Sequence, residues 1–170
     1  MRWSSSPKIM HRRATSSIRV DEGLVLRPAA RTHTPEIVEA FEETWPDVIM
    51  AMPWINPDNE IRPQIEDFIA DTERKGRSGL LHHWIMIRPW DGYVIGLIGF
   101  DRVTRSNRAT WNLGYWVRSS EQRHGYARRS IDAALGWLGQ VGELIVCLLY
   151  TSPSPRDQRG SGVGGGGGEK

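Results

Sequence analysis

Cysteine is almost absent from this chain of 170 residues, and long apolar runs are missing altogether. The one cysteine, Cys147, excludes an internal disulfide framework and is typical of a reducing compartment. No apolar run approaches the roughly 18–20 residues that a membrane-spanning helix needs. The composition therefore predicts a single domain, long enough to bury a core, that works in the cytoplasm and does not use a membrane.

Two common phosphate-binding motifs are missing as well. A Walker loop ends in Gly-Lys-Ser or Gly-Lys-Thr, and no Gly-Lys pair occurs in the chain. A dinucleotide fold needs Gly-x-Gly-x-x-Gly with an acid about 20 positions later. The turn around Gly125 has one glycine, and Glu143 is the only acid at a suitable distance. These absences argue against a Walker-type nucleotide site and against a dinucleotide fold.

Acidic residues are absent from the first twenty positions, which hold five basic ones. The net charge of +2 is therefore unevenly spread, because residues 21–150 hold 14 basic and 18 acidic residues, a net of −4. A net-negative body lacks the electrostatic footprint of a nucleic-acid-binding protein. We expect a cationic acceptor, and no nucleic acid, as its partner.

The two ends of the chain differ in composition from its middle. Residues 1–15 are rich in Ser and Arg and lack a secretory signal, so we expect a disordered leader, with Met10 as an alternative start. Seven of the last eleven residues are glycine, and the segment from Cys147 to Asp157 resembles translated sequencing-adapter sequence. The expected division is a leader at 1–15, a domain at 16–143, and a non-native or disordered tail at 144–170. Residues 143–150 could alternatively form a buried strand.

Apolar periodicity predicts alternating secondary structure between these ends. A helix is expected between Thr34-Pro35 and Trp45-Pro46, and a second from about Asp58 to Lys75, stopped by Gly76. Strands are expected at 24–27, 83–88, 93–100 and 110–117, and a last helix at 126–138. Consecutive strands with short turns, and helices before and after them, predict an α+β fold with a mainly antiparallel twisted sheet flanked by helices.

The most informative segment runs from Tyr115 to Ala127. It predicts an apolar strand, a short turn, and then Gln122-Arg-His-Gly125-Tyr-Ala127 at the start of an amphipathic helix. The first N–H groups of a helix have no partner within it, and this end of the helix dipole is positive. A glycine there lets the backbone approach an anion closely. The segment therefore predicts a phosphate-binding site for a nucleotide-type cofactor.

This segment resembles a known family. Gln-x-x-Gly-x-Ala after a strand ending Gly114-Tyr115-Trp116-Val117 is similar to the acetyl-CoA loop of GNAT N-acetyltransferases. More narrowly, it resembles the RimJ/RimL group, which acetylates N-terminal amines of ribosomal proteins. The resemblance covers about residues 16–143 and implies the GNAT acyl-CoA N-acyltransferase fold. It also implies a missing second half, which would open with a strand splayed from the one ending at Val117.

The resemblance implies roles for the residues of the loop and of the strand. Backbone N–H groups from Arg123 to Arg128 would hold the cofactor pyrophosphate, and Gly125 would leave room for it. The edge at 116–118 would pair with the pantetheine arm, and an N–H near 115–117 would stabilise the oxyanion as an amine attacks the thioester directly. The co-substrate is acetyl-CoA, with no metal, and its implied contacts are Trp116, Val117, Arg118, Gln122, Arg123, His124, Gly125, Tyr126, Ala127 and Arg128.

The resemblance identifies the residues for acid–base chemistry and for acceptor binding less directly than those of the cofactor loop. Many relatives carry an acid two positions before the Gly-Tyr-Trp, where this chain has Asn112, which cannot act as a base but could position the acceptor amine. Asp101, at the end of the previous strand, is a candidate substitute, although a solvated turn carboxylate fits the same position. Met52, Trp54 and Tyr115 are expected to line the acceptor pocket.

Two adjacent histidines, His82 and His83, lie where the strand at 83–88 begins. Neighbouring strand residues point to opposite faces, so the two side chains make a poor metal pair. We therefore expect structural roles for both and predict no metal site.

Two functions from different classes fit the sequence. The first is an N-acetyltransferase that moves the acetyl group of acetyl-CoA to a primary amine, either a protein N-terminus or a small amine. The second is a non-catalytic acyl-CoA-binding or interaction module, or an inactive fragment of an acetyltransferase. Asn112 and the missing second half favour the non-catalytic module. The overall sequence pattern favours the N-acetyltransferase. Turnover of acetyl-CoA with a panel of amines would separate them.

Overall fold

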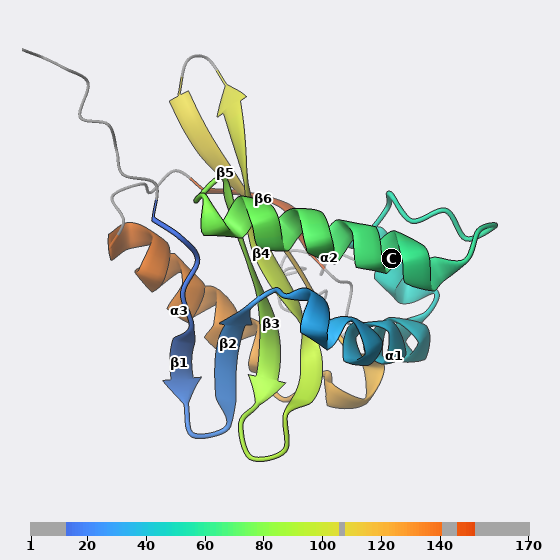
Figure 1. The fold of residues 1–170 in the computed structure, drawn as a ribbon. Helices are drawn as coiled ribbons and strands as arrows, with labels where there is room; N and C mark the ends of the chain where they lie inside the picture. Colours follow the sequence, from blue (N-terminus) through green and yellow to red (C-terminus); the bar gives the residue numbers. More distant parts are fainter. Residues whose placement is uncertain (1–12, 106–107, 141–145, 152–170) are drawn as a thin grey trace, which may run out of the picture.

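The computed structural model describes residues 13–105, 108–140 and 146–151. Its centre is one twisted sheet with its strands in chain order (Figure 1). The first five pair antiparallel, and the sixth runs parallel to the fifth. The strands are β1 (Ile18–Asp21), β2 (Leu24–Pro28), β3 (Leu81–Arg88), β4 (Tyr93–Arg105), β5 (Arg108–Val117) and β6 (Val146–Thr151).

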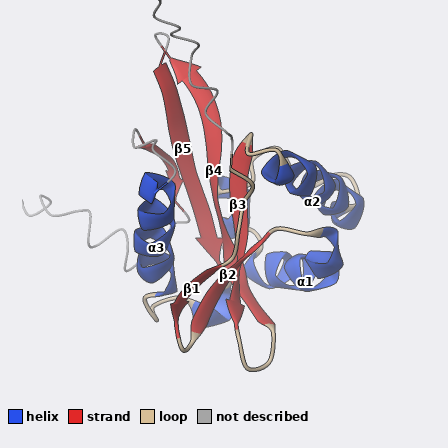
Figure 2. Ribbon diagram, turned by 60° about the vertical axis from the view of Figure 1, so that its left-hand side comes forward, coloured by secondary structure: helices blue, strands red, loops and turns tan. Residues whose placement is uncertain are grey.

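Helices cover both faces of the sheet (Figure 2). Helices α1 (Thr34–Thr44) and α2 (Ile61–Arg77) lie on one face, and α3 (Tyr126–Gln140) lies on the other. Three short 3₁₀ turns, η1 (Arg31–His33), η2 (Asp47–Met50) and η3 (Ser119–Glu121), connect these elements. The expected α+β fold, a mainly antiparallel sheet flanked by helices, is confirmed. None of the helices within the described ranges combines the length and hydrophobicity needed to cross a bilayer.

The alternation of side chains along the strands produces two separate cores. On β3, Ile85 and Ile87 pack with α1 and α2, while Trp84 and Met86 pack on the α3 side. Successive strand residues point to opposite faces, so an almost continuous apolar run fills both layers. The same alternation decides which residues of β4 and β5 face the functional site.

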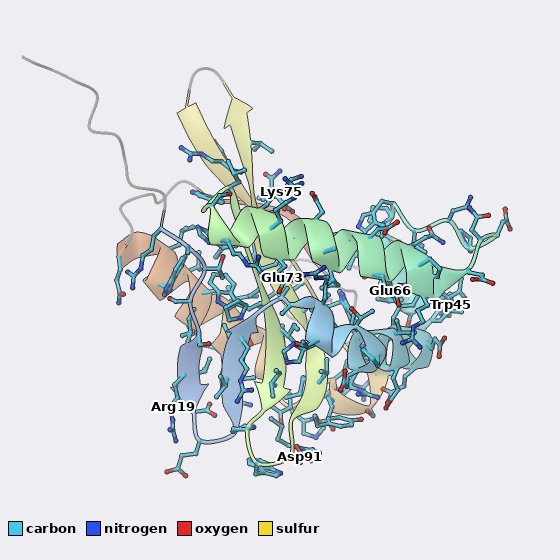
Figure 3. All side chains as sticks on the ribbon, viewed as in Figure 1. Arg19, Trp45, Glu66, Glu73, Lys75 and Asp91 are labelled. Atoms are coloured by element: carbon cyan, nitrogen blue, oxygen red, sulfur yellow. The ribbon has the colours of Figure 1, made fainter. Side chains whose placement is uncertain are left out.

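Helix α2 is held in place by ion pairs and by a glycine just beyond its end. Glu73, on the side of α2 facing η1, forms an ion pair with Arg31 at 3.0 Å (Figure 3). The helix passes through Gly76, the expected stop, and ends at Arg77. Gly79 takes the left-handed conformation (φ 74°), and the Gly79 and Leu80 N–H groups donate back to the carbonyls of residues 76 and 75. This Schellman cap replaces the predicted stop, because it needs its glycine after the helix.

Strands β4 and β5 form a longer hairpin than the sequence predicts. Their pairing extends to Arg105 and Arg108, whereas strands were expected only at 93–100 and 110–117. The turn predicted at Ser106-Asn107 lies outside the described residues. Near the other end of the hairpin, a Cβ at Gly96 would stand 2.1 Å from the Trp116 carbonyl oxygen. A glycine is therefore required for the close approach of these two backbones.

Strand β6 lies inside the segment expected to be a non-native or disordered tail from residue 144. Residues 146–151 instead pair with β5 in parallel, from Trp111 to Tyr115. The physical reason is that 146–150 is an apolar, strand-forming run, and β5 offers the unpaired N–H and C=O groups of a sheet edge. The strand takes the position beside β5 that the resemblance assigns to the first strand of the missing half.

A buried histidine makes the stability of the fold depend on pH. His82 is 2% exposed, accepts or donates a hydrogen bond with Thr15 Oγ1 at 2.8 Å, and lies among the rings of Trp84, Trp111 and Trp137. Burial, with the nearby charges of His83 and Arg102, lowers the pKa of His82 from 6.5 to about 4. Its neutral form is thus the one that fits the core.

We expect the free energy of unfolding to fall as the pH drops from 6.5 towards 4. In this window the unfolded chain binds a proton at His82 that the folded chain does not. His82 therefore makes its full contribution to the free energy of unfolding only above pH 6.5. The loss is about 3 kcal/mol by pH 4. Urea denaturation at several pH values checks this against His82→Gln, which cannot titrate. A His82→Gln curve with the same pH slope as the wild type would contradict it.

Candidate functional site

The turn between β5 and α3 is held in an unusual backbone conformation. Arg123 (φ 70°) and Gly125 (φ 75°) are both left-handed, a region that residues other than glycine rarely occupy. The Gln122 side-chain amide donates to the Val117 carbonyl at 3.0 Å, and His124 Nδ1 lies 3.1 Å from the Glu121 carbonyl oxygen. The backbone conformation therefore favours glycine at 125, in addition to the space that glycine leaves.

The start of α3 presents N–H groups to the space above this turn. The Arg129 N–H donates to the Gly125 carbonyl at 3.1 Å, which is the first bond of the helix. The N–H groups of residues 126–128 come before that bond and so have no acceptor within the helix. The Arg129 side chain is fixed to β1 by an ion pair with Asp21 at 2.5 Å, while Arg128 is exposed. The geometry fits an anion such as a pyrophosphate.

Arg118, predicted to contact the cofactor, is instead part of the protein interior. Its side chain is 3% exposed and bonds to Glu39, Glu43 and the Val94 carbonyl, at 2.9–3.1 Å. Its N–H donates to the Ile95 carbonyl at 2.8 Å. The position does not fit the predicted contact, because both its guanidinium and its N–H are used within the fold. The sequence could not show this, since Glu43 lies 75 residues earlier.

The outer edge of β5 changes along its length. Its pairing with β6 reaches Tyr115, and within the described residues no strand pairs with Trp116 or Val117 on that side, where the Val117 carbonyl accepts from the Gln122 side chain. An open strand edge at this point is what pairing with a pantetheine arm would need. That pairing remains a prediction, now with a suitable edge beside the anion-binding turn.

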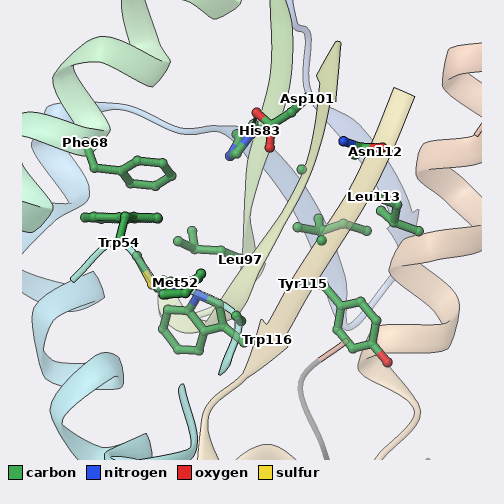
Figure 4. A pocket seen from close by; sticks show the side chains of 15 residues that line it. Met52, Trp54, Phe68, His83, Leu97, Asp101, Asn112, Leu113, Tyr115 and Trp116 are labelled. Atoms are coloured by element: carbon green, nitrogen blue, oxygen red, sulfur yellow. Dashed lines mark hydrogen bonds and ion pairs between the residues drawn. The ribbon is translucent and has the colours of Figure 1, made fainter. Parts of the chain in front are cut away.

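A cavity of about 230 Å³ opens on the α1/α2 side of the sheet, between α2, η2 and strands β3–β5 (Figure 4). It extends from the loop after η2 to the part of β5 next to the open edge. Its lining residues are Ala51, Met52, Pro53, Trp54, Phe68, His83, Leu97, Ile98, Gly99, Asp101, Asn112, Leu113, Gly114, Tyr115 and Trp116.

The predicted acceptor-binding residues all line this cavity, but in different ways. Trp54 is 44% exposed and stacks on Phe68 with ring centroids 4.5 Å apart, while Met52 is buried below it. Tyr115 is different, because its buried side chain belongs to the α3-side core (Figure 4). Tyr115 therefore lines the cavity from a position whose side chain packs on the other face of β5, and its role in acceptor binding stays a prediction.

The two predicted catalytic residues face each other across the hairpin. Asp101 on β4 pairs with Asn112 on β5, and both line the cavity. Asp101 Oδ1 also lies 2.8 Å from Nε2 of His83 on β3. Burial raises the pKa of Asp101, but the charge and hydrogen bond of His83, with a smaller effect of Lys75, outweigh it and hold this pKa below its usual value. Asp101 is thus a carboxylate that contacts His83 beside the cavity, with a side chain that is 57% exposed.

His83 is the functional candidate that sequence reasoning missed. The two histidines do point to opposite faces, as expected, which leaves His82 in the core and places His83 at the cavity. The sequence did contain an indication, because residues two positions apart on a strand point to the same face. His83 therefore lies on the same face as Ile85. No group of three or more His, Cys, Asp or Glu side chains suited to a metal is found among the residues that the structure describes.

Two buried polar atoms on the cavity residues have no hydrogen-bond partner among the described residues. They are Asn112 Oδ1, an acceptor, and Trp116 Nε1, a donor. Leaving such a group unsatisfied costs about 1–3 kcal/mol, and native proteins rarely accept that cost without a reason. A donor-and-acceptor pair on residues that line one cavity favours a ligand that carries the complementary groups.

Comparison with known proteins agrees with this geometry. A family model described as "Acetyltransferase (GNAT) domain" matches residues 23–152, which include β6. The ribosomal-protein-serine acetyltransferase of Escherichia coli (strain K12) is 27% identical over 138 residues, covering 76% of this chain and 70% of that protein.

Two solved structures share the fold. The ribosomal-protein-S5-alanine acetyltransferase from Vibrio fischeri gives a TM-score of 0.67 at 16% identity, covering 86% of this chain and 79% of that one. A RimL ribosomal L7/L12 alpha-N-protein acetyltransferase in complex with coenzyme A gives a TM-score of 0.62 at 16% identity, covering 76% and 71%. The matched family uses acetyl-CoA, which fits the turn and open edge described above.

Proposed function

We propose, from the premise that the chain belongs to the GNAT acetyltransferase family, that its acceptor is the N-terminal amine of a protein or peptide. As a member of that family it is an N-acetyltransferase that takes the acetyl group from acetyl-CoA. The relative from Escherichia coli is named for a ribosomal-protein serine, which supports a protein acceptor and a cytoplasmic location. The observation that carries the proposal is the pair of buried, unpartnered polar atoms on two residues that line the cavity.

A peptide N-terminus offers the groups that these atoms lack. Its amine can donate to Asn112 Oδ1, and the carbonyl of its first residue can accept from Trp116 Nε1. A polyamine supplies donors but no acceptor, so it would leave the indole N–H unsatisfied. The exposed face of Trp54, stacked on Phe68, gives the peptide an aromatic wall at the mouth of the cavity.

The residues of the chain divide the remaining work. The N–H groups of residues 126–128 and the left-handed turn at Gly125 would bind the pyrophosphate of acetyl-CoA, which supplies an activated thioester. The open edge at Trp116 and Val117 would hold the pantetheine arm and offer an N–H to the developing oxyanion. The cavity would bring the amine to the same edge, since its lining continues from Trp54 to Trp116. No covalent enzyme intermediate is needed.

Acceptor preference tests the proposal. We expect acetyl-CoA-dependent thiol release with Ser- or Ala-initiated peptides at a kcat/KM at least about 10-fold above that for a polyamine, the worth of roughly one satisfied hydrogen bond. The same peptide with a blocked N-terminus is the matched control and should give none. Equal or faster turnover of the polyamine would contradict the protein-acceptor proposal and would leave the family activity in place.

A further inference from the structure

A histidine and a carboxylate lie side by side on the cavity wall, on neighbouring strands. In the register of the sheet, His83 on β3 is opposite Gly99, and Asp101 lies two residues further along β4. Asn112 on β5 is opposite Asp101. All three side chains are on the α1/α2 face and line the cavity, with Asp101 and His83 adjacent in Figure 4. The His83 side chain is 12% exposed.

Three contacts fix the His83 ring. Asp101 Oδ1 lies 2.8 Å from Nε2, and the Phe68 ring meets it edge-on with centroids 5.8 Å apart. The third contact is with Gly99, where an added Cβ would come within 2.5–2.6 Å of the imidazole atoms Cγ, Cδ2 and Nδ1. The ring therefore lies directly on the backbone of β4, in a space that only glycine leaves open. Such a ring is pre-oriented, which is what a catalytic group needs.

The hydrogen bond also determines which ring nitrogen is basic. The pKa of Asp101 lies below its usual value, so at neutral pH its carboxylate is ionised and can only accept a hydrogen bond. Nε2 must then carry the proton, which leaves the lone pair of the neutral ring on Nδ1. Nδ1 has no hydrogen-bond partner among the residues that the structure describes. A carboxylate that orients an imidazole in this way also stabilises the imidazolium that forms when the ring gains a proton.

We propose that His83 is the general base of the transfer and that Asp101 is its positioning residue; this assignment rests on the proposed function. An alkylammonium acceptor gives one proton to Nδ1 of His83, which passes it to solvent. The neutral nitrogen then forms a bond to the thioester carbonyl carbon, the carbon–sulfur bond breaks, and the second proton lost by nitrogen goes to the thiolate. The products are the N-acetyl amine, the CoA thiol and one released proton.

The neighbouring groups are less suited to this role. Asn112 has no basic atom, and Asp101 is a weaker base than an imidazole because its pKa is lowered. His82 points to the opposite face and is buried among tryptophans. The other charge acting on Asp101 is Lys75 from α2. Asn112 on β5 cannot act as a base, and His83 on β3 takes that role in this proposal.

Replacing His83 with asparagine should lower kcat by about 100-fold or more, the usual worth of a general base, and remove the acid limb of the pH–rate profile. Acetyl-CoA affinity and the thermal midpoint should stay near wild type. A second variant, Asp101→Asn, should lower kcat by less than His83→Asn does. It should shift the acid limb of the pH–rate profile rather than remove it. His33→Asn, on a histidine that does not line the cavity, is the matched control. An active His83→Asn variant with an unchanged pH profile would overturn the assignment.

A measurement independent of turnover separates this inference from the proposed function. Long-range ¹H–¹⁵N spectra of the histidine rings should show His83 with its proton on Nε2, and its Nδ1 resonance should shift when a peptide with a free N-terminus is added. The Nδ1–H tautomer, or no shift at a saturating concentration of peptide, would overturn the assignment. A wild-type protein that acetylates no amine would instead refute the proposed function, whatever the tautomer.

Discussion

Replacing Gly125 with valine is expected to weaken acetyl-CoA binding by about 100-fold or more. The left-handed φ of 75° is strongly disfavoured for a β-branched residue, at a cost of roughly 1–3 kcal/mol, so the turn would move to relieve it. Moving the turn displaces the N–H groups of residues 126–128, and each charge-assisted hydrogen bond lost is worth about 1.5–3 kcal/mol. Two such losses correspond to the expected change in affinity.

Calorimetric titration of acetyl-CoA measures this effect, with Gly136→Val as the matched control. Gly136 lies in α3, is exposed, and has nothing within 4 Å of an added Cβ. The control should bind as the wild type does. Unchanged affinity in Gly125→Val would mean that the phosphates do not lie at this turn.

Replacing Arg118 with methionine is expected to destabilise the fold by about 3 kcal/mol, because it removes the buried member of an ion pair together with its hydrogen bonds to Glu43 and to the Val94 carbonyl. The Arg118 guanidinium joins the end of β5 to α1 through Glu43, bonds to the Val94 carbonyl, and stacks on Tyr93 at 4.2 Å. Burial raises the pKa of Glu43, but hydrogen bonds from Arg118 and Ser120 hold it below its usual value. Urea denaturation at pH 7 gives the free energy of unfolding directly.

Arg31→Met is the control for this prediction. Arg31 also forms an ion pair with a helix residue, Glu73, but its own side chain is 68% exposed. Exposed pairs contribute about 1 kcal/mol at most, so this variant should stay close to wild type. If the two variants lost the same free energy, the guanidinium of Arg118 would not be the buried tie that the structure shows.

Local chemistry accounts for what the sequence could predict. The glycine, the helix start and the alternation of strand side chains all act over a few positions, so they identified the turn at Gly125, the helix after it and the opposite faces of His82 and His83. The placement of Met52 and Trp54 at the cavity followed from their position between two helices. The antiparallel order followed from short turns between consecutive strands.

Long-range pairing accounts for what the sequence could not predict. His83 and Asp101 are 18 residues apart and become partners only through the register of β3 and β4. Arg118 reads as part of the cofactor loop until Glu43, on α1, is brought beside it. The sequence left two alternatives for residues 143–150, a strand or part of a non-native tail, because the edge of β5 with which they pair is 35 residues earlier in the chain.

The most direct test of the account is mass spectrometry of a Ser-initiated peptide after incubation with the chain and acetyl-CoA. The account predicts a gain of one acetyl group on the N-terminal amine, dependent on acetyl-CoA, and strongly reduced in both Gly125→Val and His83→Asn. Binding of acetyl-CoA without any acetylated product, across peptides and small amines, would contradict the claim that this chain is an N-acetyltransferase.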